Sequence, residues 1–183
     1  VVIIGSTRSI MGATNGSLKA MTSAELGSQV ANGLLTRLEG MSRSFRRREV
    51  EYFILGNSVG AGSGQNLPRQ IAALAGFGPV EAAFVVNELC GSGLEAIILG
   101  AQAVRLGEYP MVLVGGVECP STAPYLITDK QLIEWQDKRV EEIQPLVVKS
   151  DIHDALWWPT DNAHAIAQAE DTTAEWVRAH GLD

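Results

Sequence analysis

Short apolar runs alternate with helical segments over the first two thirds of the chain, and this alternation limits the fold more than any other feature. Four runs have the length and composition of buried strands: Val1–Ile4, Glu51–Leu55, Ala82–Leu89 and Met111–Val117. The segments between them are predicted to be helices: 22–39, Leu67–Ala75 and Gly91–Leu106. Strands that alternate with helices predict βαβ units, and continuous apolar strands predict a sheet covered on both faces. We therefore predict an α/β fold with a mainly parallel sheet.

The first predicted helix has a defined start. Thr22 precedes Glu25 by three residues, which is the spacing of a capping box. Apolar residues then recur every fourth position, as in an amphipathic helix: Leu26, Val30, Leu34 and Leu38. A basic cluster follows, made of Arg43, Arg46, Arg47 and Arg48. A solvated connection and a patch for an anionic ligand are the two interpretations of this cluster.

The charge of the chain is acidic and unevenly distributed. The 183 residues carry 14 Lys and Arg against 21 Asp and Glu, a net charge of −7. Residues 1–125 are balanced, with nine basic residues and nine glutamates, so the excess of acid lies entirely in residues 126–183. This shift near Tyr125 predicts a structural boundary. It also argues against nucleic acid as a partner, because phosphate binding needs a basic surface.

Hydropathy and cysteine content limit the setting in which the chain works. We expect no apolar run to be long enough to span a bilayer, because the longest runs have the length of strands. We therefore expect no membrane span and no membrane partner. Two cysteines cannot form a disulfide framework, and a reducing compartment is therefore expected. These observations predict a cytoplasmic protein.

Cys90 lies where the third predicted strand ends and a helix begins. Free backbone N–H groups and the positive end of the helix dipole favour the thiolate at this place. Gly91 and Gly93 remove side chains beside the sulfur, and N–H groups of the same turn could stabilise an oxyanion. Only Glu95 is charged in the first three turns of the helix, which predicts a buried, dry site. An inert, buried cysteine is the alternative.

The segment Val86-Asn87-x-x-Cys90-Gly91-Ser92-Gly93-Leu94-x-Ala96-Ile97 resembles the acyl-enzyme cysteine signature of the thiolases, the family of acetyl-CoA acetyltransferases and 3-ketoacyl-CoA thiolases. Three further segments resemble this family in the same order: Gly12-x-x-x-Gly16-Ser17-Leu18-Lys19, Gly56-Asn57-x-x-x-Ala61-Gly62-x-Gly64-Gln65-Asn66-x-x-Arg69-Gln70, and Gly115-Gly116-x-Glu118-x-x-Ser121-x-Ala123-Pro124-Tyr125. Four matching segments in the order of the family support this resemblance more specifically than any single glycine pattern does.

The resemblance implies acyl transfer between CoA thioesters, by Claisen condensation or thiolytic cleavage, with Cys90 as the nucleophile that forms an acyl-enzyme. Gly91 and Gly93 would then shape the acyl site, and CoA would be part of the substrate, with no cofactor. Glu118 is expected to be a buried hydrogen-bonding acid. Cys119 stands where the family usually has serine, and it is expected to be a small packing residue. The alternatives are a condensing enzyme of the ketosynthase or hydroxymethylglutaryl-CoA-synthase type, and a non-catalytic assembly subunit.

Motifs of the second half of a thiolase do not occur in these 183 residues. In the family, a histidine of a Gly-His-Pro motif activates the nucleophile, and a second cysteine in a Cys-x-Gly motif moves the proton. His153, His164 and His180 match no such motif. The resemblance therefore covers the N-terminal half, and we expect a complementary chain to supply the second half, with further oligomerisation. A truncated fragment and a chain that has lost catalysis are the alternatives.

Residues 126–183 resemble, loosely, the start of the loop domain that holds the pantetheine arm of CoA in thiolases. His164 is thereby a candidate for substrate contact, with an ordinary loop or helix histidine as the alternative. A helix is predicted over 162–180. Trp157 and Trp158 could line an acyl slot or anchor the small domain on its partner. Acids and histidines here match no zinc or calcium spacing, so no metal site is expected. The predicted organisation is a thiolase-like α/β half over residues 1–125 and a partial loop domain, acidic and partly helical, over 126–183.

Overall fold

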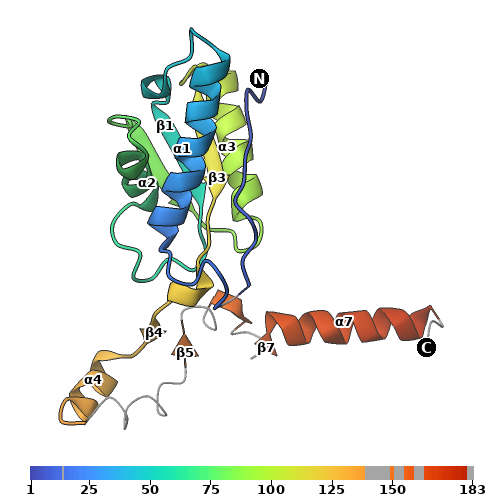
Figure 1. The fold of residues 1–183 in the computed structure, drawn as a ribbon. Helices are drawn as coiled ribbons and strands as arrows, with labels where there is room; N and C mark the ends of the chain where they lie inside the picture. The colour runs from blue at the N-terminus through green and yellow to red at the C-terminus, as the bar shows by residue number, and fades with distance from the viewer. Residues whose placement is uncertain (14, 139–148, 151–154, 159–162, 181–183) are drawn as a thin grey trace. The chain divides into compact units, whose positions relative to one another are not determined.

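A computed structural model describes residues 1–13, 15–138, 149–150, 155–158 and 163–180 (Figure 1). The chain divides into two compact units, Val1–Ala123 and Pro124–Asp183.

The first unit is built on a three-stranded parallel sheet in the order β2-β1-β3. Its strands are β1 (Tyr52–Gly56), β2 (Ala82–Val86) and β3 (Val112–Gly116). Gly56 pairs with both Val86 and Gly116, so the three strands end together at one edge. One helix lies in each crossover: α2 (Leu67–Ala75) between β1 and β2, and α3 (Ser92–Leu106) between β2 and β3. The α/β fold with a parallel sheet is thus confirmed.

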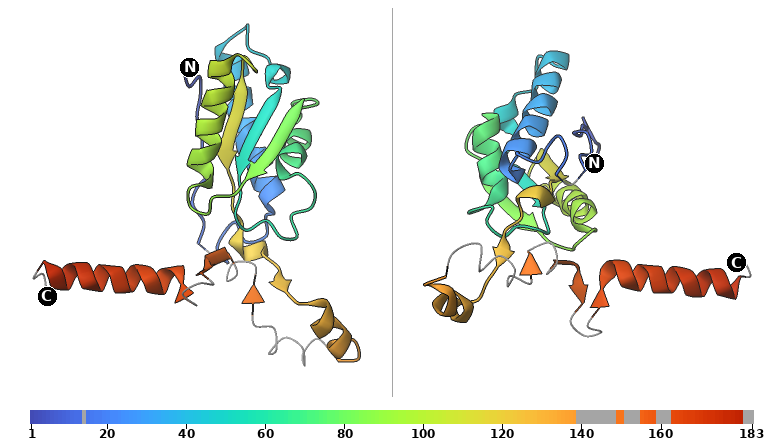
Figure 2. Two further views of the ribbon diagram at one scale, coloured as in Figure 1. Left: turned by 180° about the vertical axis from the view of Figure 1, so that it is seen from behind. Right: turned by 60° about the horizontal axis from the view of Figure 1, so that its bottom comes forward.

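Helices cover both faces of this sheet. Helix α1 (Ser23–Met41) and α2 lie on one face, and α3 lies on the other (Figure 2). Side chains alternate between the faces along a strand, so Phe53 and Leu55 join the apolar core beneath α1 and α2, while Ile54 is fully buried on the α3 side. The parallel strands are therefore buried on both faces, as their continuous apolar sequences predict.

Local signals explain where the first two helices begin and end. Thr22 and Glu25 form the predicted capping box, in which the Thr22 hydroxyl accepts the Glu25 N–H at 3.2 Å. Helix α2 follows Asn66, whose side chain accepts the Arg69 N–H at 3.3 Å, and it ends at Gly76 in the left-handed conformation.

Helix α3 packs closely on the sheet through small residues. A Cβ on Gly100 would overlap the Val114 side chain of β3, so only glycine allows this approach. The opposite face of α3 exposes large apolar side chains: Leu94, Ile97, Ile98 and Leu106. The stretch Leu89–Leu106 has a mean hydropathy of 1.3 and is long and apolar enough to cross a membrane. The expectation that all apolar runs are strand-sized is therefore wrong. A core helix that packs on a sheet can have the same length and hydropathy, so this stretch is weak evidence for a membrane span.

The expected strand at Val1–Ile4 is wrong. These residues form no strand, and they are 54–82% exposed. A strand needs a hydrogen-bonding neighbour, and in the described residues β3 pairs only with β1. The segment that follows instead lies along α1, where the Arg37 guanidinium donates a hydrogen bond to the Ser6 carbonyl. Strand β2 is also shorter than expected, since it ends at Val86.

The second unit contains short elements. Strand β4 (Tyr125–Leu126) pairs antiparallel with β5 (Lys149–Ser150), and β6 (Trp157–Trp158) pairs antiparallel with β7 (Ala163–His164). Its described helices are α4 (Asp129–Trp135) and α7 (Ala165–Ala179). Helix α7 confirms the helix predicted over 162–180, with a later start because residues 163–164 form β7.

Candidate functional site

The carboxyl ends of the three parallel strands meet at one edge of the sheet, and the chemically reactive side chains of the first unit follow these ends directly. Asn57 and Ser58 come after β1, Cys90 comes four residues after β2, and Glu118 and Cys119 come after β3. In open α/β sheets, ligands bind outside the carboxyl ends of the strands. This edge is therefore the candidate active site.

Cys90 directly precedes Gly91, the N-cap residue of α3, and its side chain is exposed. The Gly91 N–H donates to the Glu88 carbonyl at 2.9 Å, and the Ser92 N–H donates to the Leu89 carbonyl at 3.1 Å. These two N–H groups are therefore occupied within the turn, and the expectation that N–H groups of this turn stabilise an oxyanion stays a prediction. Cys90 itself is exposed, so the expected buried surroundings of the sulfur are wrong for this chain by itself.

Glycines bring the first turn of α3 against the ends of β1 and β3. A Cβ on Gly56 would lie 2.7 Å from the Gly93 nitrogen, and a Cβ on Gly116 would lie 3.6 Å from the Gly93 Cα. A Cβ on Gly93 itself would meet no atom within 4 Å, whereas one on Gly91 would lie 3.2 Å from the Glu88 carbonyl oxygen. Open space thus lies beside the backbone of Gly93, three residues after Cys90.

The turn that carries Cys90 is held by hydroxyl groups. The buried Ser92 hydroxyl accepts the Glu88 N–H at 2.8 Å and donates to the Leu89 carbonyl at 2.6 Å. The Ser58 hydroxyl also donates to the Leu89 carbonyl, at 3.0 Å, although it comes from the loop after β1. Sequence reasoning missed Ser58, since nothing in its local pattern indicates a contact 31 residues away.

The Glu118 carboxylate organises the loop after β1. It accepts hydrogen bonds from the N–H groups of Ser58 and Val59, both at 3.0 Å, and from the Asn57 side-chain amide at 2.5 Å. Glu118 is thus a hydrogen-bonding acid, as expected, but its side chain is exposed instead of buried. The same Asn57 amide donates to the Val117 carbonyl at 2.9 Å. The ends of β1 and β3 are therefore joined through side chains.

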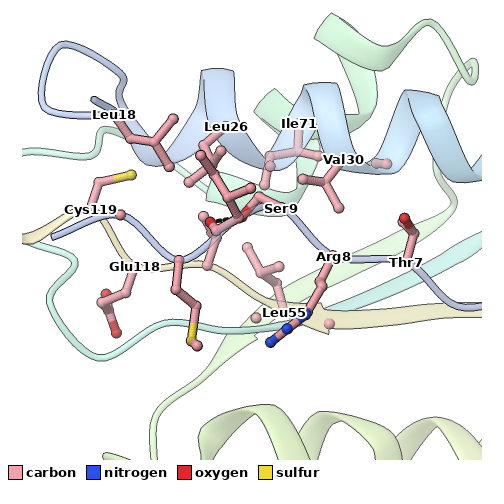
Figure 3. A pocket seen from close by; sticks show the side chains of 18 of the residues that line it. Thr7, Arg8, Ser9, Leu18, Leu26, Val30, Leu55, Ile71, Glu118 and Cys119 are labelled. Carbon is pink, nitrogen blue, oxygen red and sulfur yellow. Dashed lines mark hydrogen bonds between the residues drawn. The ribbon is translucent and has the colours of Figure 1, made fainter. Parts of the chain in front are cut away.

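A cavity of about 500 Å³ lies between the N-terminal segment, α1 and β3 (Figure 3). Apolar side chains of α1, α2 and β1 form much of its wall, and Glu118 and Cys119 lie toward one end. Cys119 is half-buried there. Cys90 does not line this cavity. The cavity and the candidate nucleophile are therefore separate features of the first unit.

Arg47, one of the four residues of the basic cluster, is held by contacts with two helices. Its guanidinium forms an ion pair with Glu39 at 2.7 Å and donates to the Ala75 carbonyl at 3.0 Å, so that it joins α1 to the end of α2. The hydrogen bonds from Arg47 lower the pKa of the Glu39 carboxyl, and the same contact raises the pKa of Arg47. Arg47 is therefore part of the packing and not a free cation for a ligand.

The remaining candidates lie in the second unit. His164 is in β7, where it pairs with Trp157 of β6. The His180 ring stacks on Trp176, with Nδ1 at 2.8 Å from the Trp176 carbonyl. His153 lies outside the described residues. Within the described residues, no three His, Cys, Asp or Glu side chains are grouped as metal ligands.

Comparison with known proteins identifies the family. The model of the thiolase N-terminal domain matches residues 1–178. A probable acetyl-CoA acetyltransferase of Escherichia coli K12 is 35% identical over 176 residues, and an acetyl-CoA acetyltransferase of Pseudomonas aeruginosa is 36% identical over 176 residues. Each alignment covers 96% of this chain and 42% of the relative, so the chain spans less than half the length of these relatives.

A solved structure agrees with this assignment. The crystal structure of a thiolase from Ascaris suum in complex with coenzyme A superposes with a TM-score of 0.60 at 29% sequence identity. The superposition covers 64% of this chain and 30% of that chain. The resemblance of the four sequence segments is thereby confirmed, and the chain belongs to the thiolase family, matching the N-terminal domain.

Proposed function

We propose that this chain takes part in acyl transfer between CoA thioesters and that Cys90 is the nucleophile. The observation that carries the proposal is the position of Cys90, which is exposed at the carboxyl edge of the sheet and directly before the N-cap of α3. An accessible sulfur at a helix start is the arrangement that a thiolate nucleophile needs. The family assignment and the names of the relatives support acyl-CoA as the substrate.

The proposed chemistry has two steps. The Cys90 thiolate attacks the carbonyl carbon of an acyl-CoA, the bond between this carbon and the CoA sulfur breaks, and CoA leaves as its thiolate. The acyl group on Cys90 is then transferred to a second acceptor, either a CoA thiolate or the carbanion of another acyl-CoA, and the Cys90 thiolate is restored. CoA thus enters and leaves the reaction as part of the substrates and products. The open space beside Gly93 supports room for the acyl group.

We further propose that a complementary chain supplies the histidine and second cysteine that this reaction needs, and that the complex oligomerises further. The exposed apolar face of α3 supports such a partner, because a large apolar patch of this kind marks an interaction surface. Exposure of Cys90 in the chain alone is consistent with a site that a second half would close. His164 is proposed to contact substrate from the second unit.

Cleavage of acetoacetyl-CoA tests the proposal. The chain is co-purified with its complementary half, and thiolytic cleavage is measured for the unmodified complex and for Cys90→Ala. We expect cleavage that Cys90→Ala abolishes, while Cys119→Ala, the matched control on the other cysteine, retains it. A complex without cleavage, assembled equally well with Cys90→Ala, would indicate an assembly subunit instead.

A further inference from the structure

Leu89, the residue before Cys90, adopts a left-handed backbone with φ of 49°. Among the described residues, the other non-glycine residues with positive φ are Asn15 and Asn66, and asparagine tolerates this region better than leucine does. The Leu89 side chain is 50% exposed, so side-chain packing does little to stabilise the conformation. Strained backbone of this kind persists only where other contacts hold it.

Hydrogen bonds to the Leu89 peptide groups supply these contacts. The Leu89 N–H donates to the Asn87 side-chain oxygen at 3.0 Å, and its carbonyl accepts the Ser92 hydroxyl at 2.6 Å. Both partners are neighbours within the turn. The Ser58 hydroxyl, at 3.0 Å from the same carbonyl, is the partner that comes from outside the turn, from the loop after β1. It connects the turn to the rest of the sheet edge.

The position of Ser58 is fixed in turn by Glu118. The Ser58 N–H donates to Glu118 Oε2 at 3.0 Å, and the Val59 N–H donates to Oε1 at 3.0 Å. A continuous set of hydrogen bonds thus runs from the end of β3 through the loop after β1 to the turn after β2. Neither Ser58 nor Glu118 belongs to this turn itself.

We propose that Ser58 is a positioning residue for Cys90. Its hydrogen bond to the Leu89 carbonyl holds the left-handed turn and keeps the sulfur at the start of α3, and Glu118 holds Ser58 in place. The inference rests on the proposed function of Cys90 as a nucleophile. It adds a contact through which the loop after β1 controls the reactivity of that nucleophile.

The test compares the two cysteines of one molecule. Alkylation by iodoacetamide is followed by peptide mass spectrometry, and the ratio of the rate constants of Cys90 and Cys119 is measured at fixed pH. Cys119 is the internal reference for a general loosening of the fold. We expect Ser58→Ala to lower the ratio roughly two- to tenfold, the factor that one hydrogen bond contributes. Ser58→Thr keeps the hydroxyl and is expected to keep the ratio.

Ser28→Ala is the matched control, because it removes another hydroxyl that donates to a backbone carbonyl, that of Glu25 at 2.8 Å in α1. The ratio of the Cys90 and Cys119 rate constants in Ser28→Ala should equal that of the unmodified chain. Glu118→Gln offers a second variant, since it removes one of the two carboxylate acceptors; because Glu118 is next to Cys119, the Cys90 rate constant of this variant is compared directly with that of the unmodified chain, and it should fall as in Ser58→Ala.

An unchanged or higher ratio in Ser58→Ala, or a low ratio that Ser58→Thr does not restore, would overturn the positioning role. If Ser58→Ala does not fold, Glu118→Gln decides in the same way. The proposed function fails separately, if acetyl-CoA leaves no acetyl group on Cys90 in the unmodified chain or in its complex with the complementary half. The alkylation ratio still tests the positioning role in that case.

Discussion

Gly56 at the end of β1 lies so close to Ser92 in the first turn of α3 that a Cβ on Gly56 would come within 2.7 Å of the Ser92 carbonyl carbon. The obstacle is backbone, which cannot rotate away as a side chain can. We expect Gly56→Ala to lower the free energy of unfolding by about 1–3 kcal/mol, the usual cost of overpacking. Urea denaturation of the purified chain measures this change.

Gly33→Ala is the control for this substitution. Gly33 is exposed within α1, and an added Cβ would meet no atom within 4 Å. Alanine should therefore raise the free energy of unfolding by about 0.5–1 kcal/mol through its higher helix propensity. Equal stability of Gly56→Ala and the unmodified chain would show that α3 does not approach β1 in this way.

Acid should weaken the contact between α1 and Arg47. Hydrogen bonds from Arg47 hold the pKa of Glu39 below its ordinary value of 4.5. A carboxyl whose pKa is lower in the folded state contributes stability above its unfolded pKa, and this contribution is lost as the pH falls through the folded pKa. The free energy of unfolding should therefore fall below about pH 4.5, and Glu39→Gln should make that fall shallower.

Glu81→Gln is the control for this pH dependence, because the Glu81 side chain makes no hydrogen bond or ion pair within the described part of the chain. Denaturation curves at several pH values measure both variants. A Glu39→Gln profile as steep as that of the unmodified chain would contradict a stabilising pair between Glu39 and Arg47.

The outer face of α3 should make the isolated chain associate with itself. Leu94 is 64% exposed, Ile97 46% and Ile98 41%, on one side of a single helix. We expect oligomers by light scattering and a lower average mass for Ile97→Lys. Leu74→Lys is the control, since Leu74 is an exposed leucine of α2, 61% exposed. A well-behaved monomer of the unmodified chain would contradict the proposed partner surface.

Local sequence signals predicted much of the fold. The capping box of Thr22 and Glu25 and the helix Leu67–Ala75 were predictable because their hydrogen bonds join residues a few positions apart. Val1–Ile4 has the composition of a strand, but a strand also needs a neighbour along its edge, which composition does not supply. The start of α3 after Cys90 was predictable because the apolar strand run ends there and a helical run of small and aliphatic residues begins at Gly91 and Gly93.

Local sequence signals could not predict the contacts that surround Cys90. The Ser58 hydroxyl and the Leu89 carbonyl meet only because β1 and β2 are adjacent and in register, and a serine in a glycine-rich loop gives no sign of this. The left-handed backbone of Leu89 has no signal either, since leucine disfavours that region. The roles of Cys90, Gly91, Gly93 and His164 in the reaction stay predictions.

Formation of an acyl group on Cys90 tests the central claim most directly. The chain is incubated with acetyl-CoA, digested, and the peptides that contain Cys90 and Cys119 are analysed by mass spectrometry. We predict one acetyl group on the Cys90 peptide, removed by hydroxylamine as expected for a thioester, absent in Cys90→Ser and retained in Cys119→Ser. An unlabelled Cys90 peptide, in the chain and in its complex with the complementary half, would contradict the account.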